Sequence, residues 1–538
     1  MEQQFELIAK TFQGLEEVLA TELTELGADN ISIGRRMVSF TGDQEMMYRA
    51  NFCLRTAIRV LKPIKHFKAK DADEVYAAVK EINWSDYLDL SNTFSVDSVI
   101  FSQEFRHSKF VAYKVKDAIV DYFRETTGKR PNIGITNPDI RLNIHIADTD
   151  CTLSLDSSGE SLHLRGYRTG SVEAPINEVL AAGLIKLSGW NFDCDLIDPF
   201  CGSGTILIEA ALMARNIYPG VFRRAFGFEK WKDFNRDLLD RIYNDDSQER
   251  PFDHHIYGYD INNPALEVAA RNVKSAGVAD CISLKQQDFK KFTQPQEKAV
   301  IITNPPYGER ITAPDLMGLY RAIGERLKHQ FVGNEAWIIC SREELFENIG
   351  LKPSFRIPLI NGSLDCEFRK YQIFDGKMQD FREKGGIVKT EEEKAEMAQQ
   401  HRFKKNREFK QLLDQQAENE EGDIRSFTFH KFERDEHHFS RPDRKPFRRR
   451  GDDDDKRGGR FGDRRDGRFG DRERRGDRRG DDWRGDRRDD RRAPGKRWSD
   501  RGGRDRRDDR RDGFRGDKRG QGDYRKQSNN KYFSDNED

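Results

Sequence analysis

Two short strings of residues, each placed directly after an apolar segment, constrain the fold of this chain more than any other feature. The first is Asp198-Pro-Phe-Cys-Gly-Ser-Gly-Thr205, which follows Leu196-Ile197 and precedes apolar residues at helical spacing over 206–212. The second is Asn304-Pro-Pro-Tyr307, which follows the apolar run 299–303. This order predicts an α/β domain with both strings at the carboxyl edge of a parallel sheet, where such folds bind their ligands.

The first string predicts a ligand-binding turn between a strand and a helix. Gly202 and Gly204 lack Cβ atoms, so a ligand can lie against the backbone, and Asp198 adds a negative charge beside it. That charge would repel a pyrophosphate. The dinucleotide fingerprint also requires a third glycine where this chain has Leu207, and the Gly-Lys-Ser/Thr of a P-loop is absent. The string therefore favours a cationic ligand over NAD or ATP, although a turn that serves only the fold is the alternative.

Two further carboxylates are expected beside the same ligand. A second buried strand is predicted to end at Asp260, which can bind ribose hydroxyls, with Ile261 next to it. A third strand over 282–284 leads to Asp288 and Phe289, which can take the amino group and ring face of an adenine, a surface turn being the alternative. Together these features predict a site for S-adenosylmethionine. Its candidate residues are Asp198, Pro199, Phe200, Gly202, Gly204, Thr205, Asp260, Ile261, Asp288 and Phe289.

The second string predicts an acceptor site for an exocyclic amino group. Its two prolines remove two backbone donors and stiffen the loop. The side-chain oxygen of Asn304 and the carbonyl of Pro305 can each accept one N–H, while Tyr307 can stack on the base. Asn304, Pro305, Pro306 and Tyr307 are therefore the candidate catalytic residues, and they act by positioning the amine rather than as covalent nucleophiles. Methylation at pyrimidine carbon five would need a cysteine nucleophile, and Cys201 is interpreted only as a small residue of the first turn.

These strings resemble those of a known family, the class I adenosylmethionine-dependent methyltransferases that carry an N-terminal THUMP RNA-binding domain. The resemblance extends from the N-terminus to about Phe374 and is greatest to bacterial enzymes that form N2-methylguanine in 23S ribosomal RNA. It implies cofactor and target-base roles for the residues named above. Enterobacterial members fuse a second methyltransferase domain, but no second Asp-x-x-x-Gly-x-Gly string follows Tyr307, so one activity is expected. The segments that carry the resemblance are Asn304-Pro-Pro-Tyr-Gly-Glu-Arg310, Arg165-Gly-Tyr-Arg168, Ala174-Pro-Ile-Asn-Glu-Val-Leu-Ala-Ala182 and Phe226-Gly-Phe-Glu-Lys-Trp231.

The predicted fold class is α/β, with a Rossmann-like class I methyltransferase domain preceded by two α+β domains. Its mostly parallel seven-stranded sheet is expected to end in an antiparallel hairpin, with strands at 354–359 and 366–374 around the turn Asn361-Gly362. Residues 216–255 are interpreted as an insertion that either touches substrate or only packs. The predicted segments are a ferredoxin-like subdomain (1–62), a THUMP domain (63–165) with a last strand at 162–164, the methyltransferase domain (166–385), a charged helical or flexible linker (386–430) and a disordered low-complexity tail rich in Arg, Asp and Gly (431–538).

Basic residues gather on and around one predicted helix of the THUMP segment. Such a cluster is an electrostatic footprint for phosphates, although a solvated helix face is the alternative. The tail carries Arg-Gly tracts with aromatics, which suggest loose RNA contact, while its interleaved aspartates suggest a self-attracting polyampholyte instead. The basic cluster comprises Arg106, His107, Lys109, Lys114, Lys116, Lys129 and Arg130.

Composition narrows the possible classes of protein. The 94 basic and 94 acidic residues balance, so net charge gives no information about partners. Seven scattered cysteines predict a reducing compartment and provide neither a zinc pattern nor a disulfide framework. No signal peptide or apolar run of membrane-spanning length is recognised. We therefore expect a cytoplasmic protein without a metal or a membrane partner.

Three functions remain open on these grounds. The first is methylation of guanine N2 in 23S rRNA, or in a large-subunit assembly intermediate, after the base is flipped out of its stack. The second keeps the fold but methylates guanine N2 in tRNA or adenine N6 in RNA or DNA, because two acceptors do not by themselves distinguish purines; the RNA-binding resemblance weighs against DNA. The third is an RNA-binding ribosome assembly factor with a vestigial methyltransferase domain, and the intact motif residues argue against it.

Overall fold

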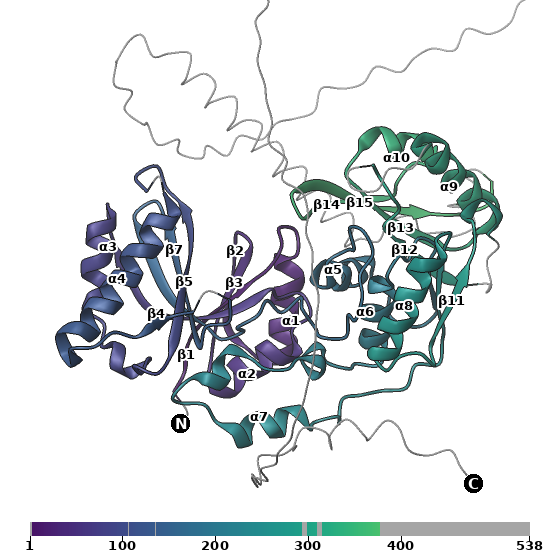
Figure 1. Ribbon diagram of the computed structural model, residues 1–538. Coiled ribbons are helices and arrows are strands. Elements are labelled where there is room, and N and C mark those ends of the chain that lie inside the picture. Colours follow the sequence, from purple (N-terminus) through teal and green to yellow (C-terminus); the bar gives the residue numbers. More distant parts are fainter. Residues whose placement is uncertain are drawn as a thin grey trace, which may run out of the picture. The chain divides into compact units, whose positions relative to one another are not determined.

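The computed structural model describes residues 3–105, 107–134, 136–292, 298–308 and 315–376, together with Glu383. The predicted linker and tail lie outside the described residues, as does Arg106. The described chain contains two mixed sheets, one of eight strands in its N-terminal part and one of seven strands in its C-terminal part (Figure 1). The predicted α/β class is confirmed, with α+β domains before the Rossmann-like domain.

The eight-stranded sheet joins the two predicted N-terminal domains. Strand β4 passes through the predicted boundary between residues 62 and 63, pairing with β1 near its start and with β8 along its length. Pro63 lies at a register shift in the β4–β8 ladder, where its missing N–H is tolerated. In pairing order the strands are β2 (Asp29–Gly34), β3 (Met37–Gly42), β1 (Phe5–Lys10), β4 (Arg59–Lys68), β8 (Asp150–Asp156), β7 (Ile140–Ala147), β5 (Thr93–Phe101) and β6 (Asn132–Ile133).

The helices of this part pack through apolar faces onto the sheet. Helix α1 buries Leu19 and Leu23 and ends at Gly27, whose left-handed backbone donates to the Leu23 and Thr24 carbonyls. The segment predicted as a last strand at 162–164 forms a turn instead, and that prediction was wrong. The helices are α1 (Glu16–Leu26), α2 (Gln44–Cys53), α3 (Ala72–Lys80), η1 (Trp84–Asp86) and α4 (Ser108–Thr127).

The seven-stranded sheet has the predicted mostly parallel order with an antiparallel end. Strands β9 to β13 pair in parallel, and β15 runs antiparallel to both β13 and β14. The hairpin turn comprises Gly362-Ser363, because Asn361 still pairs with Leu364; the expected Asn361-Gly362 turn was wrong by one residue. In pairing order the strands are β11 (Ile282–Gln286), β10 (Ile256–Asp260), β9 (Asp195–Asp198), β12 (Ala299–Thr303), β13 (Glu335–Cys340), β15 (Leu364–Gln372) and β14 (Phe355–Asn361).

Helices cover both faces of this sheet (Figure 1). Successive strand residues therefore enter different cores: Leu196 and Ile302 join one apolar cluster, and Ile197 and Ile301 join the other. Burial on both faces explains why these strands are continuous apolar runs rather than alternating ones. The helices are α5 (Glu178–Ser188), α6 (Thr205–Ala214), α8 (Asn263–Ser275), α9 (Leu316–Gln330) and α10 (Glu343–Ile349).

The insertion over 216–255 packs against the N-terminal part. It contains η2 (Pro219–Phe222), η3 (Gly227–Lys230) and α7 (Arg236–Tyr243). The Phe228 ring is 1% exposed and stacks on Tyr48 of α2 with ring centroids 4.0 Å apart, and the Tyr48 hydroxyl accepts the Asn235 N–H at 2.9 Å. The insertion thus joins the two sheets through a shared aromatic core.

This packing predicts a large stability loss for Phe228→Ala. Removal of a buried stacked ring should cost about 3 kcal/mol of unfolding free energy, measured by urea denaturation of the full chain. Ile33→Ala, at a side chain that is 45% exposed, should change it by less than about 0.5 kcal/mol. Equal effects of the two substitutions would contradict the structural role of the insertion.

Candidate functional site

The glycine string forms the turn from β9 into α6. Gly202 and Gly204 both adopt left-handed backbone, with φ of 53° and 82°. A Cβ on Gly204 would lie 3.3 Å from the Ala269 Cβ, so this glycine allows α6 to approach α8. A Cβ on Gly202 would meet only the Val172 side chain, at 3.8 Å, among its described surroundings. Open space therefore lies over Gly202, as a ligand-binding turn requires.

Asp198 is buried beneath this turn rather than displayed on it. Its side chain is 1% exposed, and its Oδ1 accepts the Phe200 N–H at 3.1 Å and the Thr303 hydroxyl at 2.6 Å. Because Thr303 is the last residue of β12, this bond ties together the starts of the two motif loops. Burial raises the pKa of the Asp198 carboxyl to about 7, with hydrogen bonds from Thr303 and Phe200 opposing the shift. The carboxyl therefore lies within the turn and not on its surface, and a charge beside a bound ligand stays a prediction.

Asp260 and Ile261 lie at the end of β10, beside the glycine turn. The half-buried Asp260 carboxylate accepts the Gly202 N–H at 2.9 Å and the Asn262 N–H at 2.8 Å. Each of its oxygens retains a lone pair for a further donor. The Ile261 side chain is 67% exposed. These two residues form the candidate rim for a ribose and an aromatic base.

The remaining predicted cofactor residues differ in how accessible they are. Asp288 is half-buried and caps η4 (Phe289–Lys291) by accepting the Lys290 N–H at 3.0 Å. Phe289 is only 4% exposed and lies in an aromatic cluster with Phe200, whose ring centroid is 5.3 Å away. The structure thus places Phe289 in an aromatic cluster beside the predicted site, and its contact with a ligand stays a prediction. Pro199 and Thr205 are also buried, within the turn and at the start of α6.

The second string begins where β12 ends, at the same edge of the sheet as the glycine turn. The Asn304 Oδ1 is buried and has no hydrogen-bond partner among the described residues. Pro305 is buried, while Pro306 and Tyr307 are half-buried. Tyr307 accepts a hydrogen bond at its hydroxyl from the Asn361 Nδ2, at 2.9 Å, and at its carbonyl from the Arg342 Nη1, at 3.4 Å. An unsatisfied buried acceptor is costly, and the N–H group of a ligand would satisfy this one.

Two residues that support the glycine turn were not predicted. Arg168 donates to the Ser203 and Thr205 hydroxyls, at 3.1 and 2.9 Å. Asn272, fully buried on α8, donates to the Ser203 and Gly170 carbonyls, each at 3.1 Å. Arg168 belongs to a segment that carries the family resemblance. Asn272 could have been singled out in the sequence because its polar amide lies among the apolar positions of one face of α8.

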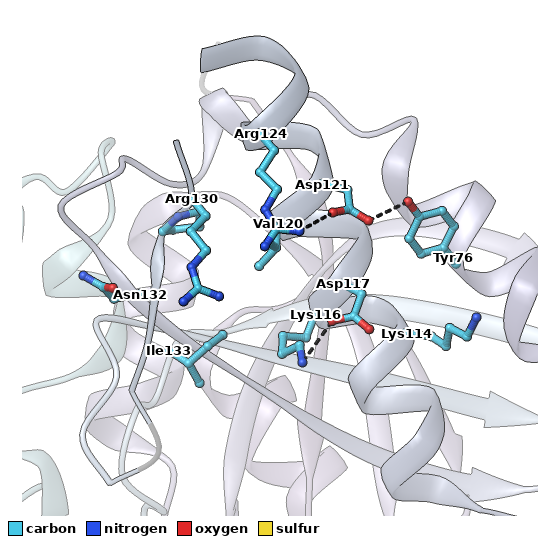
Figure 2. Close-up of a pocket in the computed structure, with 11 residues that line it drawn as sticks. Tyr76, Lys114, Lys116, Asp117, Val120, Asp121, Arg124, Arg130, Asn132 and Ile133 are labelled. Atoms are coloured by element: carbon cyan, nitrogen blue, oxygen red, sulfur yellow. Dashed lines mark hydrogen bonds and ion pairs between the residues drawn. The ribbon is translucent and has the colours of Figure 1, made fainter. Parts of the chain in front are cut away.

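The basic cluster of the THUMP segment borders a concave pocket of about 590 Å³ (Figure 2). Lys114, Lys116 and Arg124 line it from α4, and Arg130 lines it from the segment leading to β6. Asp117 and Asp121 also line it, so the lining carries four cations and two carboxylates. Arg124 was not predicted, although it lies two turns beyond Asp117 on the same helix face. His107, Lys109 and Lys129 are exposed.

Exposed aromatic side chains accompany these cations. Phe110 is 53% exposed and Tyr113 is 58% exposed, both on the first half of α4. The Lys114 Nζ lies 5.6 Å from the Phe110 ring centroid, and the Lys116 Nζ lies 5.2 Å from that of Tyr113. Lys114 is also paired with Asp73, and this hydrogen bond raises the pKa of the lysine. Aromatic rings beside cations are typical of surfaces that bind nucleic-acid strands.

Within the described ranges, no three His, Cys, Asp or Glu side chains are grouped so that they could hold a metal ion. The same residues include no helix with the length and apolar character needed to cross a bilayer.

Three family profiles match this chain in succession. Residues 6–61 match the RlmL ferredoxin-like domain, residues 69–156 match the THUMP domain, and residues 165–370 match the RMKL-like methyltransferase domain. A Synechocystis protein named as a candidate RNA methyltransferase, slr0064, is 37% identical over 373 residues, which are 68% of this chain and 96% of that protein. The ribosomal RNA large subunit methyltransferase K/L of Photobacterium profundum is 37% identical over 410 residues, 74% of this chain. This chain spans only 57% of that relative's length.

Solved structures have the same fold. A candidate methyltransferase, SMU.472, complexed with SAH, is 30% identical with a TM-score of 0.63; the match covers 70% of this chain and 100% of that one. A protein from Listeria monocytogenes described as a predicted N6-adenine-specific DNA methylase is 32% identical with a TM-score of 0.62, over 69% and 97% of the two chains.

The buried Asp198 carboxyl predicts a pH-dependent stability difference between the wild type and Asp198→Asn. The amide keeps the acceptor for Thr303 and Phe200 but has no charge to desolvate. Because the folded pKa is raised, the carboxyl ionises in the unfolded chain before it ionises in the folded one. The unfolding free energy of the wild type therefore falls as pH rises from about 4 toward 7. Relative to the wild type, the variant should gain about 2 kcal/mol of unfolding free energy between pH 5 and pH 8, measured by urea denaturation. A difference that does not change with pH would contradict the buried carboxyl.

Proposed function

Because this chain belongs to the RMKL-like methyltransferases with N-terminal ferredoxin-like and THUMP domains, we propose that it methylates the exocyclic N2 of a guanine in 23S ribosomal RNA. S-Adenosylmethionine is the methyl donor of the reaction. An rRNA substrate is supported by the names of the K/L relatives, of which this chain spans about half the length. The choice of guanine, and of its N2, is our proposal. We expect the protein to act in the cytoplasm, where ribosomes assemble.

The observation that carries this proposal is the Asn304 Oδ1, a buried acceptor without a hydrogen-bond partner in the part of the chain that the structure describes. An exocyclic amino group has two N–H donors, and the Pro305 carbonyl is the natural second acceptor beside Asn304. Two acceptors in the plane of the N–H bonds draw the nitrogen lone pair out of conjugation with the ring. The lone pair then points out of the base plane and can attack a methyl group. Catalysis of this kind depends on positioning and needs no covalent nucleophile from the protein.

The residues of the adjacent turn fit the proposed methyl donor. The space over Gly202 admits a ligand against the backbone. Asp260 has acceptor capacity left for ribose hydroxyls, and the exposed Ile261 offers an apolar surface for adenine. When bound, S-adenosylmethionine supplies an electrophilic methyl group. The Asp198–Thr303 bond keeps the two loops together, so the amine and this methyl group can be held at one edge of the sheet.

The target guanine must leave its base stack to reach this edge. A base in a duplex shields its amino group, so enzymes acting on it flip the nucleotide out or use unpaired RNA. We assign Tyr307, half-buried at the loop, to stacking on the flipped base. We assign the pocket lined by Lys114 and Arg130, together with the exposed His107, Lys109 and Lys129, to contacts with RNA phosphates.

Adenine N6 is the second candidate, because the Asn304 loop does not itself distinguish purines and one structural relative is described as a predicted adenine-specific DNA methylase. Guanine N2 in tRNA is a third candidate substrate, and its methylation would use the same positioning of an exocyclic amino group.

Nucleoside mass spectrometry separates these substrates. We would digest 23S rRNA, tRNA and DNA from a strain lacking the gene, before and after incubation with the purified full chain and S-adenosylmethionine. The proposal predicts N2-methylguanosine restored in 23S rRNA. Its appearance in tRNA, or N6-methyladenine in any substrate, would replace the proposal with one of the alternatives. No product in any substrate would favour a protein without methyltransferase activity.

Asn304→Ala should reduce turnover by roughly a hundredfold or more, on the scale expected for the loss of an oriented electrostatic contact. Affinity for S-adenosylmethionine, measured by calorimetry, should stay near the wild-type value because Asp260 and the glycine turn are intact. Wild-type turnover in this variant would refute the acceptor role.

Lys109→Ala and Arg130→Ala should each weaken RNA binding and lower the slope of log affinity against log salt by about one. Turnover at saturating RNA should not change, because neither residue touches the reacting atoms. Lys298→Ala serves as the control. Its side chain pairs with Asp193 at the amino edge of the seven-stranded sheet, and removing it should leave RNA affinity unaltered.

A further inference from the structure

We propose that Asn361 is a positioning residue that holds the ring of Tyr307 in place for the target base. The inference rests on the proposed function, since it assigns Tyr307 to the base. Its physical basis is the hydrogen bond from the Asn361 Nδ2 to the Tyr307 hydroxyl, at 2.9 Å. The donor comes from β14 and the acceptor from the loop after β12, two segments separated by 54 positions.

The backbone at position 361 does not require asparagine. Asn-Gly pairs are common in hairpin turns because both residues tolerate positive φ. Here Asn361 is the last residue of β14 and pairs with Leu364, and its φ is not positive. Only Gly362 has the left-handed conformation, with φ of 66°. The amide at this position is therefore better explained by its side-chain contact with Tyr307 than by the turn.

The hydrogen bond from Asn361 reaches the hydroxyl end of the Tyr307 side chain, while other contacts restrain the backbone of the same loop. The Arg342 Nη1 donates to the Tyr307 carbonyl at 3.4 Å. The next residue, Gly308, has φ of 88°, and a Cβ there would lie 2.7 Å from the Leu316 Cδ1, so the chain passes through a narrow space. With the backbone held, two torsions decide where the phenol ring lies. A bond to its hydroxyl restricts both.

The hairpin that supplies Asn361 is itself supported. A Cβ on Gly14 would lie 2.7 Å from both the Pro358 carbonyl oxygen and the Leu359 Cδ2, so the turn before α1 packs directly against β14. Leu359 is 3% exposed, inside the core of the seven-stranded sheet. The donor is thus mounted on a packed strand, which is the support a binding residue needs to be preorganised. A ring placed in advance reduces the ordering cost when a base enters.

The test is a double-mutant cycle measured as turnover at saturating RNA and S-adenosylmethionine. Asn361→Ala and Tyr307→Phe each remove one partner of the same bond, and each should lower kcat about fivefold, the effect of one hydrogen bond between neutral groups. The double variant should be no slower than either single variant. Independent roles would multiply to roughly 25-fold. RNA affinity and the KM for S-adenosylmethionine should not change.

Conservative and control variants separate positioning from hairpin stability. Asn361→Asp can accept a hydrogen bond from the Tyr307 hydroxyl, so it should recover most of the lost turnover. Ser363→Ala, in the exposed turn of the same hairpin, should match the wild type. Wild-type kcat in Asn361→Ala, or a multiplicative double variant, would overturn the inference.

A spectroscopic measurement keeps the inference testable if no methyl transfer is found. With tyrosine labelled at 13Cζ in the full chain, the Tyr307 resonance is identified by its loss in Tyr307→Phe. It should shift in Asn361→Ala and stay unmoved in Ser363→Ala. An unmoved resonance in Asn361→Ala would show that the bond is absent, whatever the enzyme's activity. A shifted resonance in a protein without methyltransferase activity would remove the proposed function and retain the contact.

Discussion

The parallel pairing of β9 with β12 is the constraint on which the candidate site depends. Parallel neighbours end at the same edge of a sheet, so Ile197 opposite Ile301 brings the glycine turn and the Asn304 loop together although they are far apart in sequence. The Thr303 hydroxyl then donates to Asp198 across the two strand ends. The Asp198 carboxyl lies where water cannot reach it, and burial raises its pKa to about 7 although the hydrogen bond from Thr303 opposes the shift.

A second constraint connects this edge to the N-terminal part of the chain. The insertion after α6 buries Phe226, Phe228 and Trp231 in the apolar cluster of the N-terminal sheet. Arg223 in the same insertion donates to several backbone carbonyls over 158–164. The buried Arg165 donates to the Arg55 carbonyl and pairs with Glu209 of α6. Among the described residues, those proposed to bind RNA and those proposed to bind the base therefore belong to the same compact unit.

The sequence predicted the local elements of this fold more fully than the contacts between them. The strand, glycine turn and helix around Gly202 follow from apolar spacing and from the freedom of glycine at positive φ, and both are local properties. The hairpin after β13 was also predicted, but its turn was displaced by one residue. Turn propensity favours Asn361, whereas strand pairing with Leu364 and the contact with Tyr307 keep it extended.

The contacts around the predicted site that the sequence could not predict have a common physical cause. The Phe289 ring lies in an aromatic cluster with Phe200 and Phe331, because a side chain's direction depends on segments that pack from elsewhere in the chain. Asn272 and Arg168 hold the glycine turn through contacts made only after α8 and the segment before α5 have packed. The role of the insertion was likewise undecided by composition, since aromatic residues suit both a substrate surface and a core.

We propose that the buried side-chain oxygen of Asn304, which has no partner among the described residues, receives the exocyclic amino group of a guanine. The most direct test compares two synthetic RNA fragments that contain the target nucleotide. One has guanosine at that position and the other has inosine, which differs only in lacking the N2 amino group. We predict that the guanosine fragment accepts a methyl group and the inosine fragment accepts none while binding with similar affinity. Methyl transfer to the inosine fragment would place the reaction at another atom and contradict the claim.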